Sequence, residues 1–130
     1  MKLHHIGIVV CSIHEYEKNM IFQSKLKEIY DPIQRAKLAL YSNFGDSYIE
    51  LIEPTDKNSF TYNYLKKNNS NYHHICYEIK NENEIEELVS KLKLLKFKGP
   101  LPALLFNNKK VSFFFSKNKQ IIEFISNKKQ

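Results

Sequence analysis

Two histidines and two glutamates recur in this sequence in a matching pattern that could bind a metal ion. His5 and His74 each follow another histidine at the start of an apolar, strand-like run. Glu50 and Glu123 each lie further along the chain, inside a second strand-like run. A repeated His…Glu arrangement indicates a duplicated half-site. Two imidazoles and two carboxylates suit Zn²⁺, Ni²⁺, Co²⁺, Mn²⁺ or Fe²⁺.

Strand alternation explains why these side chains should share a face. Alternate residues of a strand point the same way, so each glutamate points away from the apolar residues beside it. A carboxylate in such surroundings is costly to bury unless it is paired or bound to a cation. By the same alternation His4 and His73 point away from the metal, and we expect them to be structural. The expected metal ligands are His5, Glu50, His74 and Glu123.

The elements that must position these residues follow the same order in both halves: strand, helix and three strands. Ser12 and Glu15 have the spacing of a capping box, which predicts a helix start. Asn43 to Asp46 suits the turn of a hairpin. The elements expected in the first half are strands at 2–10, 27–33, 36–42 and 47–53, and a helix at 12–26.

The second half repeats the pattern after a polar segment that we expect to carry a short helix. An amphipathic face predicts its helix, and the hairpin is expected to turn at residues 117–119. Its expected elements are strands at 72–79, 97–101, 111–116 and 120–126, and a helix at 82–96. The sequence therefore predicts an α+β fold of two tandem βαβββ modules forming a curved mixed sheet around a metal-binding cleft. Module one spans 1–54, the linker 55–71 and module two 72–127.

Composition limits the function classes. A chain of 130 residues with 42% hydrophobic residues is expected to form one domain. No apolar run approaches the ~20 residues that span a bilayer, and the first residues lack a signal-peptide layout. We therefore expect a cytoplasmic protein with reduced Cys11 and Cys76. The net charge of +6 is spread along the chain without a nucleic-acid motif, so we expect neither nucleic acid nor membrane as a partner and interpret most of the charge as a solvated surface. The alternative is that a few lysines neutralise a small anionic substrate.

These residues resemble the vicinal oxygen chelate superfamily, which includes glyoxalase I, extradiol dioxygenases, fosfomycin and bleomycin resistance proteins and methylmalonyl-CoA epimerase. The chain is most similar to the epimerases. The segments that carry the resemblance are 5–10, 50–54, 60–67 and 73–79. The resemblance implies a divalent metal (Zn, Ni, Co or Mn) held by the four expected ligands, which stabilises an enolate-type intermediate. It also implies Glu123 and Glu50 as the catalytic carboxylates, a small acid or thioester such as a CoA thioester as substrate, and a homodimer.

One departure from the epimerase pattern limits the assignment. Epimerases of this type carry a further acid–base glutamate, and counting back from Glu50 places Gln34 at that position. A neutral amide cannot accept a proton at neutral pH, and Asp31 or Glu53 replaces it only if the register differs. Three alternatives therefore stay open: a glyoxalase I-type lyase, a non-catalytic small-molecule binding protein of the resistance type, and a structural subunit of another enzyme.

Overall fold

The computed structural model describes residues 1–129, with side chains described through Asn127. The chain divides into two compact units. Residues 5–73 form the first unit, and residues 1–4 together with the chain from His74 onward form the second. None of the helices within the described residues is both long and apolar enough to cross a membrane.

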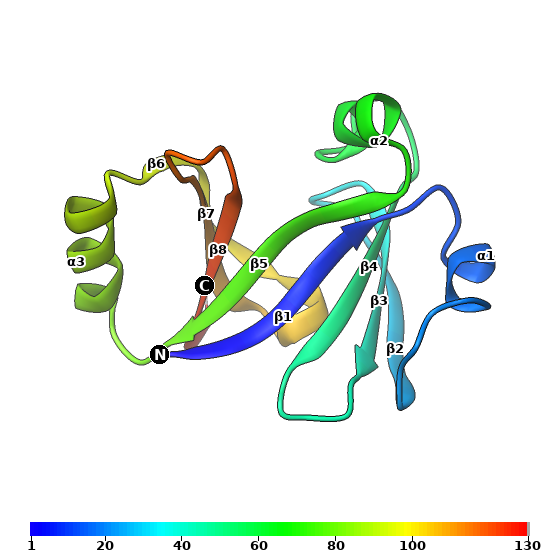
Figure 1. Ribbon diagram of the computed structural model, residues 1–130, viewed down its shortest axis with the longest axis horizontal. Coiled ribbons are helices and arrows are strands. Elements are labelled where there is room, and N and C mark those ends of the chain that lie inside the picture. The colour runs from blue at the N-terminus through cyan, green and yellow to red at the C-terminus, as the bar shows by residue number, and fades with distance from the viewer. Residues whose placement is uncertain (130) are drawn as a thin grey trace. The chain divides into compact units, whose positions relative to one another are not determined.

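The first unit is built on four strands in the order β2-β3-β4-β1 (Figure 1). Strands β1 and β4 are parallel, and the other two pairings are antiparallel. A further short helix follows β4, as the sequence predicts for this polar segment. The elements are β1 (Lys2–Val9), α1 (Ile13–Glu17), β2 (Ser24–Asp31), β3 (Ala36–Ser42), β4 (Tyr48–Pro54) and α2 (Tyr62–Asn68).

The second unit repeats this plan with the strand order β5-β8-β7-β6. Strands β5 and β8 are parallel, and the remaining pairings are antiparallel. The elements are β5 (Asn71–Ile79), α3 (Glu82–Leu92), β6 (Leu95–Ala103), the 3₁₀ helix η1 (Leu104–Phe106), β7 (Lys109–Phe115) and β8 (Ile121–Lys129). The α+β class and the two βαβββ modules are confirmed.

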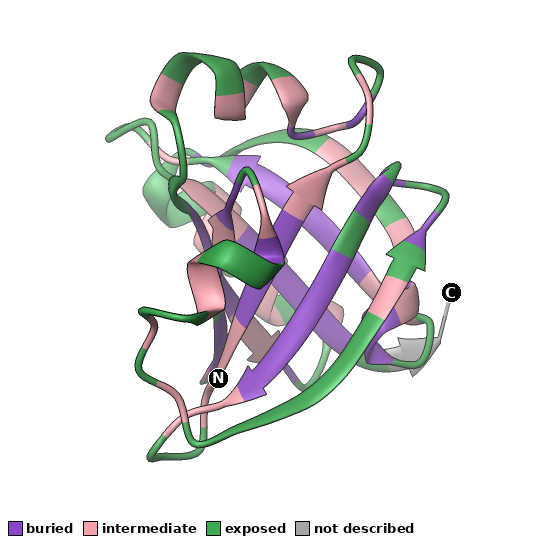
Figure 2. Ribbon diagram, turned by 90° about the vertical axis from the view of Figure 1, so that its right-hand side faces the viewer, coloured by how far each residue is buried: buried purple, intermediate pink, exposed green. Residues whose placement is uncertain are grey.

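The core of the first unit lies between its sheet and helix α1. The strands contribute one face to it, and the helix contributes Ile13, which is 3% exposed. Strand β3 is largely buried, whereas the neighbouring edge strand β2 is almost wholly exposed (Figure 2). The buried residues of this cluster are Val10, Ile13, Ala39, Tyr41 and Leu51. Ile49 and Leu51 pack on this side, which leaves the other face of β4 for Glu50, as strand alternation predicts.

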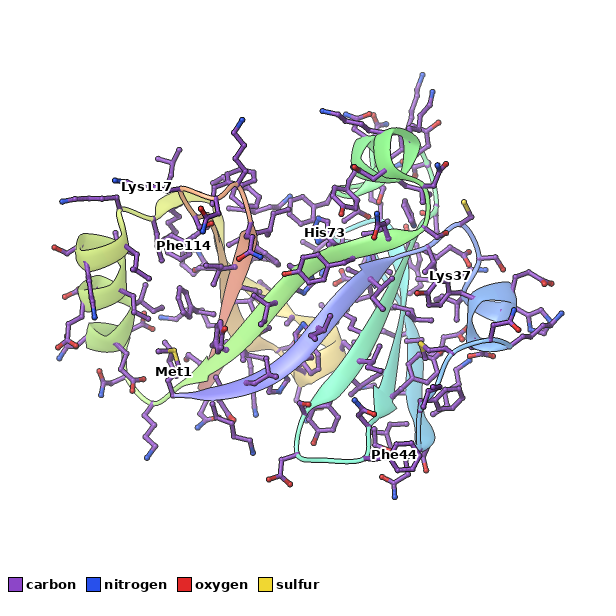
Figure 3. The ribbon with its side chains drawn as sticks, viewed as in Figure 1. Met1, Lys37, Phe44, His73, Phe114 and Lys117 are labelled. Atoms are coloured by element: carbon purple, nitrogen blue, oxygen red, sulfur yellow. The ribbon has the colours of Figure 1, made fainter. Side chains whose placement is uncertain are left out.

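The core of the second unit lies between its sheet and helix α3. Phe114 points from β7 toward this helix (Figure 3) and packs with Phe124 at a ring separation of 5.5 Å. Helix α3 presents Ile85, Leu88 and Val89 to the same cluster. The sheet face carrying Phe114 is therefore the core face, and strand alternation leaves Phe113 and Phe115 on the opposite face.

The helix predicted at 12–26 is wrong in length. Ser12 caps it as expected, accepting a hydrogen bond from the Glu15 amide at 3.2 Å, but the helix ends at Glu17. A tight turn follows, and the Gln23 amide donates to the Ser42 carbonyl at 2.9 Å. That bond begins the pairing of β2 with β3, so the strand starts at Ser24 instead of residue 27. The apolar positions that predicted a longer helix still reach the core, because Met20 and Phe22 pack there from non-helical backbone.

The helix predicted at 82–96 also ends early, at Leu92, because Lys93 adopts a left-handed conformation with φ 56°. Strand β6 therefore begins at Leu95 and is longer than the predicted 97–101. Its pairing with β7 is irregular on both sides of Lys98. Gly99 has φ +98°, and a Cβ built there lies 2.6 Å from the Val111 carbonyl oxygen. Strand β6 approaches β7 this closely only because residue 99 has no side chain.

We predict that Gly99→Ala lowers the free energy of unfolding by roughly 1 to 3 kcal/mol, because the left-handed backbone and the clash with β7 both oppose a Cβ. Urea unfolding measures the change. Gly45→Ala is the matched control, since a Cβ there meets nothing within 4 Å. Equal stabilities for the two variants would contradict the close approach of β6 to β7.

We also predict that Tyr41→Phe raises the pKa of Glu17 toward its ordinary value of 4.5. The Tyr41 hydroxyl donates to Glu17 Oε2 at 2.5 Å, and this bond, with Lys25, holds the pKa of that carboxyl below the ordinary value. Burial raises the pKa of Tyr41 itself, which keeps its hydroxyl a donor. Because the folded pKa is lowered, the stability that Glu17 contributes is present above pH 4.5 and is lost as the pH falls through the lowered pKa.

An NMR titration of the Glu17 carboxyl carbon measures this shift in the wild type and the variant. Tyr30→Phe serves as the control, because Tyr30 is 51% exposed on the same strand as Lys25. An unchanged Glu17 pKa in Tyr41→Phe would show that the hydrogen bond does not set it.

Candidate functional site

The first unit brings His5 and Glu50 together on neighbouring strands. In the parallel pairing of β1 with β4, His5 lies opposite Tyr48 and Gly7 lies opposite Glu50. The side chains meet with His5 Nε2 3.5 Å from Glu50 Oε1. Both are buried, with side-chain exposures of 0% and 6%. The parallel register is thus what places this imidazole beside this carboxylate.

The second unit brings His74 and Glu123 together in the same way. In the parallel pairing of β5 with β8, His74 lies opposite Ile121 and Cys76 lies opposite Glu123. His74 Nε2 lies 3.0 Å from Glu123 Oε1, and the side-chain exposures are 2% and 5%. In each unit, therefore, the residue two positions after the histidine pairs with the glutamate. The duplication seen in the sequence therefore extends to the strand register, which is the same in both units.

The chemistry of these donors fits a divalent metal ion. A carboxylate withdrawn from water is costly unless hydrogen bonds or a positive charge compensate it, and a bound divalent cation would supply that charge to each pair. Imidazole nitrogen and carboxylate oxygen are common ligands of zinc and of other first-row transition metals. Each unit therefore offers one nitrogen donor and one oxygen donor that are already held together.

The two neighbouring histidines have other surroundings. His4 is 8% exposed and packs edge-on against Phe106, with ring centres 4.8 Å apart. His73 is 6% exposed and packs edge-on against Tyr64 at the same separation. Their aromatic contacts within their own units agree with the structural role expected of them.

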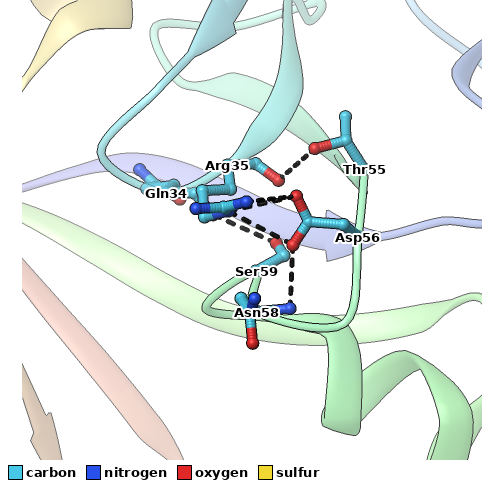
Figure 4. Close-up of polar contacts among 6 residues, drawn as sticks. All are labelled: Gln34, Arg35, Thr55, Asp56, Asn58 and Ser59. Carbon is cyan, nitrogen blue, oxygen red and sulfur yellow. Dashed lines mark hydrogen bonds and ion pairs between the residues drawn. The ribbon is translucent and has the colours of Figure 1, made fainter.

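Gln34 lies on a turn whose backbone is held on both sides. Its carbonyl accepts hydrogen bonds from the Ser59 hydroxyl at 3.0 Å and from the Phe60 amide at 3.2 Å. Its own amide donates to Asp31 Oδ1 at 3.2 Å. Arg35 forms a bidentate pair with Asp56 beside it (Figure 4), with bonds of 3.0 and 2.9 Å to Oδ2. The turn is thus fixed to the loop after β4.

The charges around this turn are mutually stabilised. The Arg35 guanidinium holds the pKa of Asp56 below its usual range, mainly through their hydrogen bonds, and the amide of Asn58 adds to the effect. The same pairing raises the pKa of Arg35. Both side chains are well exposed, so the pair serves mainly to define the geometry of the loop.

Asp31 and Glu53, which could have replaced a missing acid–base glutamate, have structural bonds instead. Asp31 is fully buried, and its Oδ1 accepts from the amides of Ile33 and Gln34. Glu53 accepts from the Ile13 amide at 2.8 Å, at the start of α1. Asp31 therefore stabilises the turn, and Glu53 stabilises the start of α1.

Sequence reasoning missed a lysine on the sheet face of each His–Glu pair. In the second unit Glu123 lies opposite Phe113, and Phe113 lies opposite Lys98. In the first unit Glu50 lies opposite Leu40, and Leu40 lies opposite Lys27. Cross-strand partners point to the same face of a sheet, so each row joins a glutamate to a lysine two strands away. The available signal was the repeated Lys-apolar-Lys tripeptide at 25–27 and 96–98.

Comparison with known proteins agrees with this architecture. The family model described as Glyoxalase/Bleomycin resistance protein/Dioxygenase superfamily matches residues 4–103. None of the curated proteins matches the chain.

Solved structures with the same fold cover nearly the whole chain. A hypothetical protein from Bacillus halodurans is 29% identical, with a TM-score of 0.82 over 99% of this chain and 96% of that one. Methylmalonyl-CoA epimerase from Mycobacterium tuberculosis is 19% identical, with a TM-score of 0.77 over 96% and 87%.

A variant of methylmalonyl-CoA epimerase from Streptomyces coelicolor, solved in complex with 2-nitronate-propionyl-CoA, is 20% identical, with a TM-score of 0.77 over 97% and 94%. At these identities the epimerases show the fold alone. The family match, which covers most of the chain, shows more than that. This chain belongs to the glyoxalase/bleomycin resistance protein/dioxygenase superfamily.

Proposed function

We propose that this chain is a metal-dependent enzyme that moves a proton at the carbon beside a carbonyl group of a small organic acid or thioester. His5, Glu50, His74 and Glu123 together are the proposed ligands of one divalent metal. The observation that carries the proposal is the pair of buried His–Glu contacts, at 3.5 and 3.0 Å, set in identical register in the two units. A single buried His–Glu pair is common in proteins. Two such pairs at equivalent positions of a repeat favour a common function, which we propose is metal binding.

The proposed roles follow from the chemistry of the side chains. When bound, the metal supplies a Lewis acid for the substrate oxygens. His5 and His74 are held at their Nε2 atoms beside the carboxylates, where they act as ligands. Glu123 removes and returns the substrate proton through its carboxylate, and Glu50 is the second candidate for this transfer. Burial of all four side chains excludes water from the groups that carry the proton.

Gln34 determines which reaction of this class is expected. Its side chain is buried, 8% exposed, and its backbone is fixed by three hydrogen bonds. An amide holds no titratable proton at neutral pH, so the second proton transfer of an epimerase has no acid–base group at this position. We therefore expect proton exchange at the substrate carbon without inversion.

Two other functions remain as alternatives. A His, Glu, His, Glu set also fits a glyoxalase I-type lyase, which differs from the first proposal in its substrate and its product. A resistance-type protein binds a small molecule without turnover, and metal content separates it from the enzymes. The epimerase comparison supports a thioester substrate because one such epimerase was solved with methylmalonyl-CoA.

We predict that protein purified without chelator contains about one divalent metal per chain. Glu123→Gln and His74→Ala are each expected to weaken metal binding by about tenfold to a hundredfold or more, since changing even a residue that supports a ligand typically costs that much. Metal analysis and competition with a fluorescent chelator measure the content and the affinity. Glu86→Gln and His14→Ala, both exposed, are the matched controls. A metal-free wild type, or equal losses in the controls, would reject the metal-dependent proposal.

We further predict that the metal-loaded protein exchanges the α-proton of methylmalonyl-CoA for deuterium while the configuration of the carbon is retained. Gln34→Glu restores a carboxylate at the fixed turn, so it is expected to add inversion to exchange. NMR measures exchange, and coupling to a stereospecific mutase measures inversion. Inversion by the wild type would contradict the role assigned to Gln34. Absence of exchange in the metal-loaded protein would exclude this thioester as the substrate.

A further inference from the structure

The internal repeat of the chain extends beyond the His–Glu pairs to a lysine at the edge of each sheet. The tripeptides Lys25-Leu26-Lys27 and Lys96-Phe97-Lys98 lie on the edge strands β2 and β6. In both strands the pairing register shifts across the middle residue, between Lys25 and Lys27 and between Lys96 and Lys98. A bulge of this kind redirects the side chain that follows it. The two lysines after the bulges are therefore equivalent positions of the repeat.

The second of these lysines lies on the sheet face that carries the second His–Glu pair. Lys98 is the cross-strand partner of Phe113, which is in turn the partner of Glu123. The ring of His74 lies 5.9 Å from that of Phe113, which confirms that they share this face. Neighbouring strands are about 4.8 Å apart, so the backbones at Lys98 and Glu123 are roughly 10 Å apart. A lysine side chain spans most of that distance.

The surroundings of the two lysines differ. Lys27 is exposed, whereas Lys98 is half-buried. Burial lowers the pKa of Lys98, so the protein removes water from this ammonium group. Phe97 precedes Lys98 in the chain, and Phe113 is its cross-strand partner. The Phe97 ring lies 6.1 Å from the Phe113 ring and stacks on the Phe115 ring at 4.1 Å. An ammonium group withdrawn from water in this way interacts more strongly with nearby charges than an exposed one does.

Two of these aromatic side chains, Phe97 and Phe115, are exposed to solvent. Phe97 and Phe115 are 36% and 37% exposed, and Leu95, the partner of Phe115, is 68% exposed. Apolar side chains with this exposure form a surface against which an apolar group can lie. The face thus offers a cation and an apolar surface side by side, within reach of Glu123.

We propose that Lys98 binds the carboxylate of an organic acid whose apolar part lies against Phe97 and Phe115. The inference rests on the proposed function only in identifying this acid as the substrate. Lys27, the repeat partner of Lys98, has no such role, because it is exposed on an edge strand whose residues 24–28 are all exposed.

Benzoate and benzamide are suitable probes, because they share a ring and differ in charge. We expect the full-length wild type to bind benzoate more tightly than benzamide in NMR shift titrations. Lys98→Met keeps the apolar stem, and it is expected to weaken benzoate binding about tenfold, the usual contribution of a charge-assisted hydrogen bond, with benzamide binding unchanged. Lys98→Arg retains the charge and should keep the preference for benzoate. Lys27→Met is the matched control and should bind both probes as the wild type does.

Three outcomes would overturn the inference: a wild type without preference for benzoate, a Lys98→Met variant with unchanged benzoate affinity, or an equal loss in Lys27→Met. The titrations are made on chelator-treated and on zinc-loaded protein, with the folding of each variant checked by its amide spectrum. Failure to bind zinc would reject the proposed function while leaving the benzoate result to decide on Lys98. Normal zinc binding with unchanged benzoate affinity in Lys98→Met would reject the anion site alone.

Discussion

The parallel pairing of the first and last strands of each module is the constraint on which the rest of the structure depends. A buried carboxylate needs a compensating partner, and only one register of β1 against β4 places His5 next to Glu50. The same register of β5 against β8 places His74 next to Glu123. A shift by one residue would turn each glutamate toward the helices, into the clusters around Leu51 and Phe124. The apolar core therefore fixes the position of the polar pairs.

Strand alternation made much of this predictable from sequence. It identified the faces of Glu50 and Glu123, because burial leaves a clear period of two. It could not locate the C-terminal end of the first helix. The apolar positions of residues 13–22 fit a helix, but Met20 and Phe22 reach the core from a turn and extended chain. The pairing of Gln23 with Ser42, a contact distant in sequence, ended the helix.

The site was only partly predictable for the same reason. The histidines and glutamates stand out because they repeat at matching positions in apolar runs. Lys98 did not stand out, since its importance depends on a bulge in β6 and on a close approach at Gly99, and neither is visible in composition. The roles of Asp31 and Glu53 were hidden as well. Their bonds to the turn before Gln34 and to the start of α1 exist only in the folded chain.

The proposed site contains a His–Glu pair from each module, and it also contains Gln34 and Lys98, which have no equivalent role in the other module. The His–Glu pairs are equivalent, as expected of ligands to a common ion. Gln34 is held on a fixed turn of the first module, and Lys98 is half-buried opposite Phe113 in the second. Such asymmetry suits a substrate whose two ends differ, with an anionic group near Lys98 and a reacting carbon near the carboxylates.

The central claim is that the four side chains bind one metal ion, and the X-ray absorption spectrum of the zinc-loaded protein tests it most directly. The account predicts a single zinc environment of nitrogen and oxygen ligands at about 2.0 to 2.2 Å, with the outer-shell scattering of two imidazoles. A sulfur ligand at about 2.3 Å, from Cys11 or Cys76, would contradict it. So would a spectrum with no imidazole scattering.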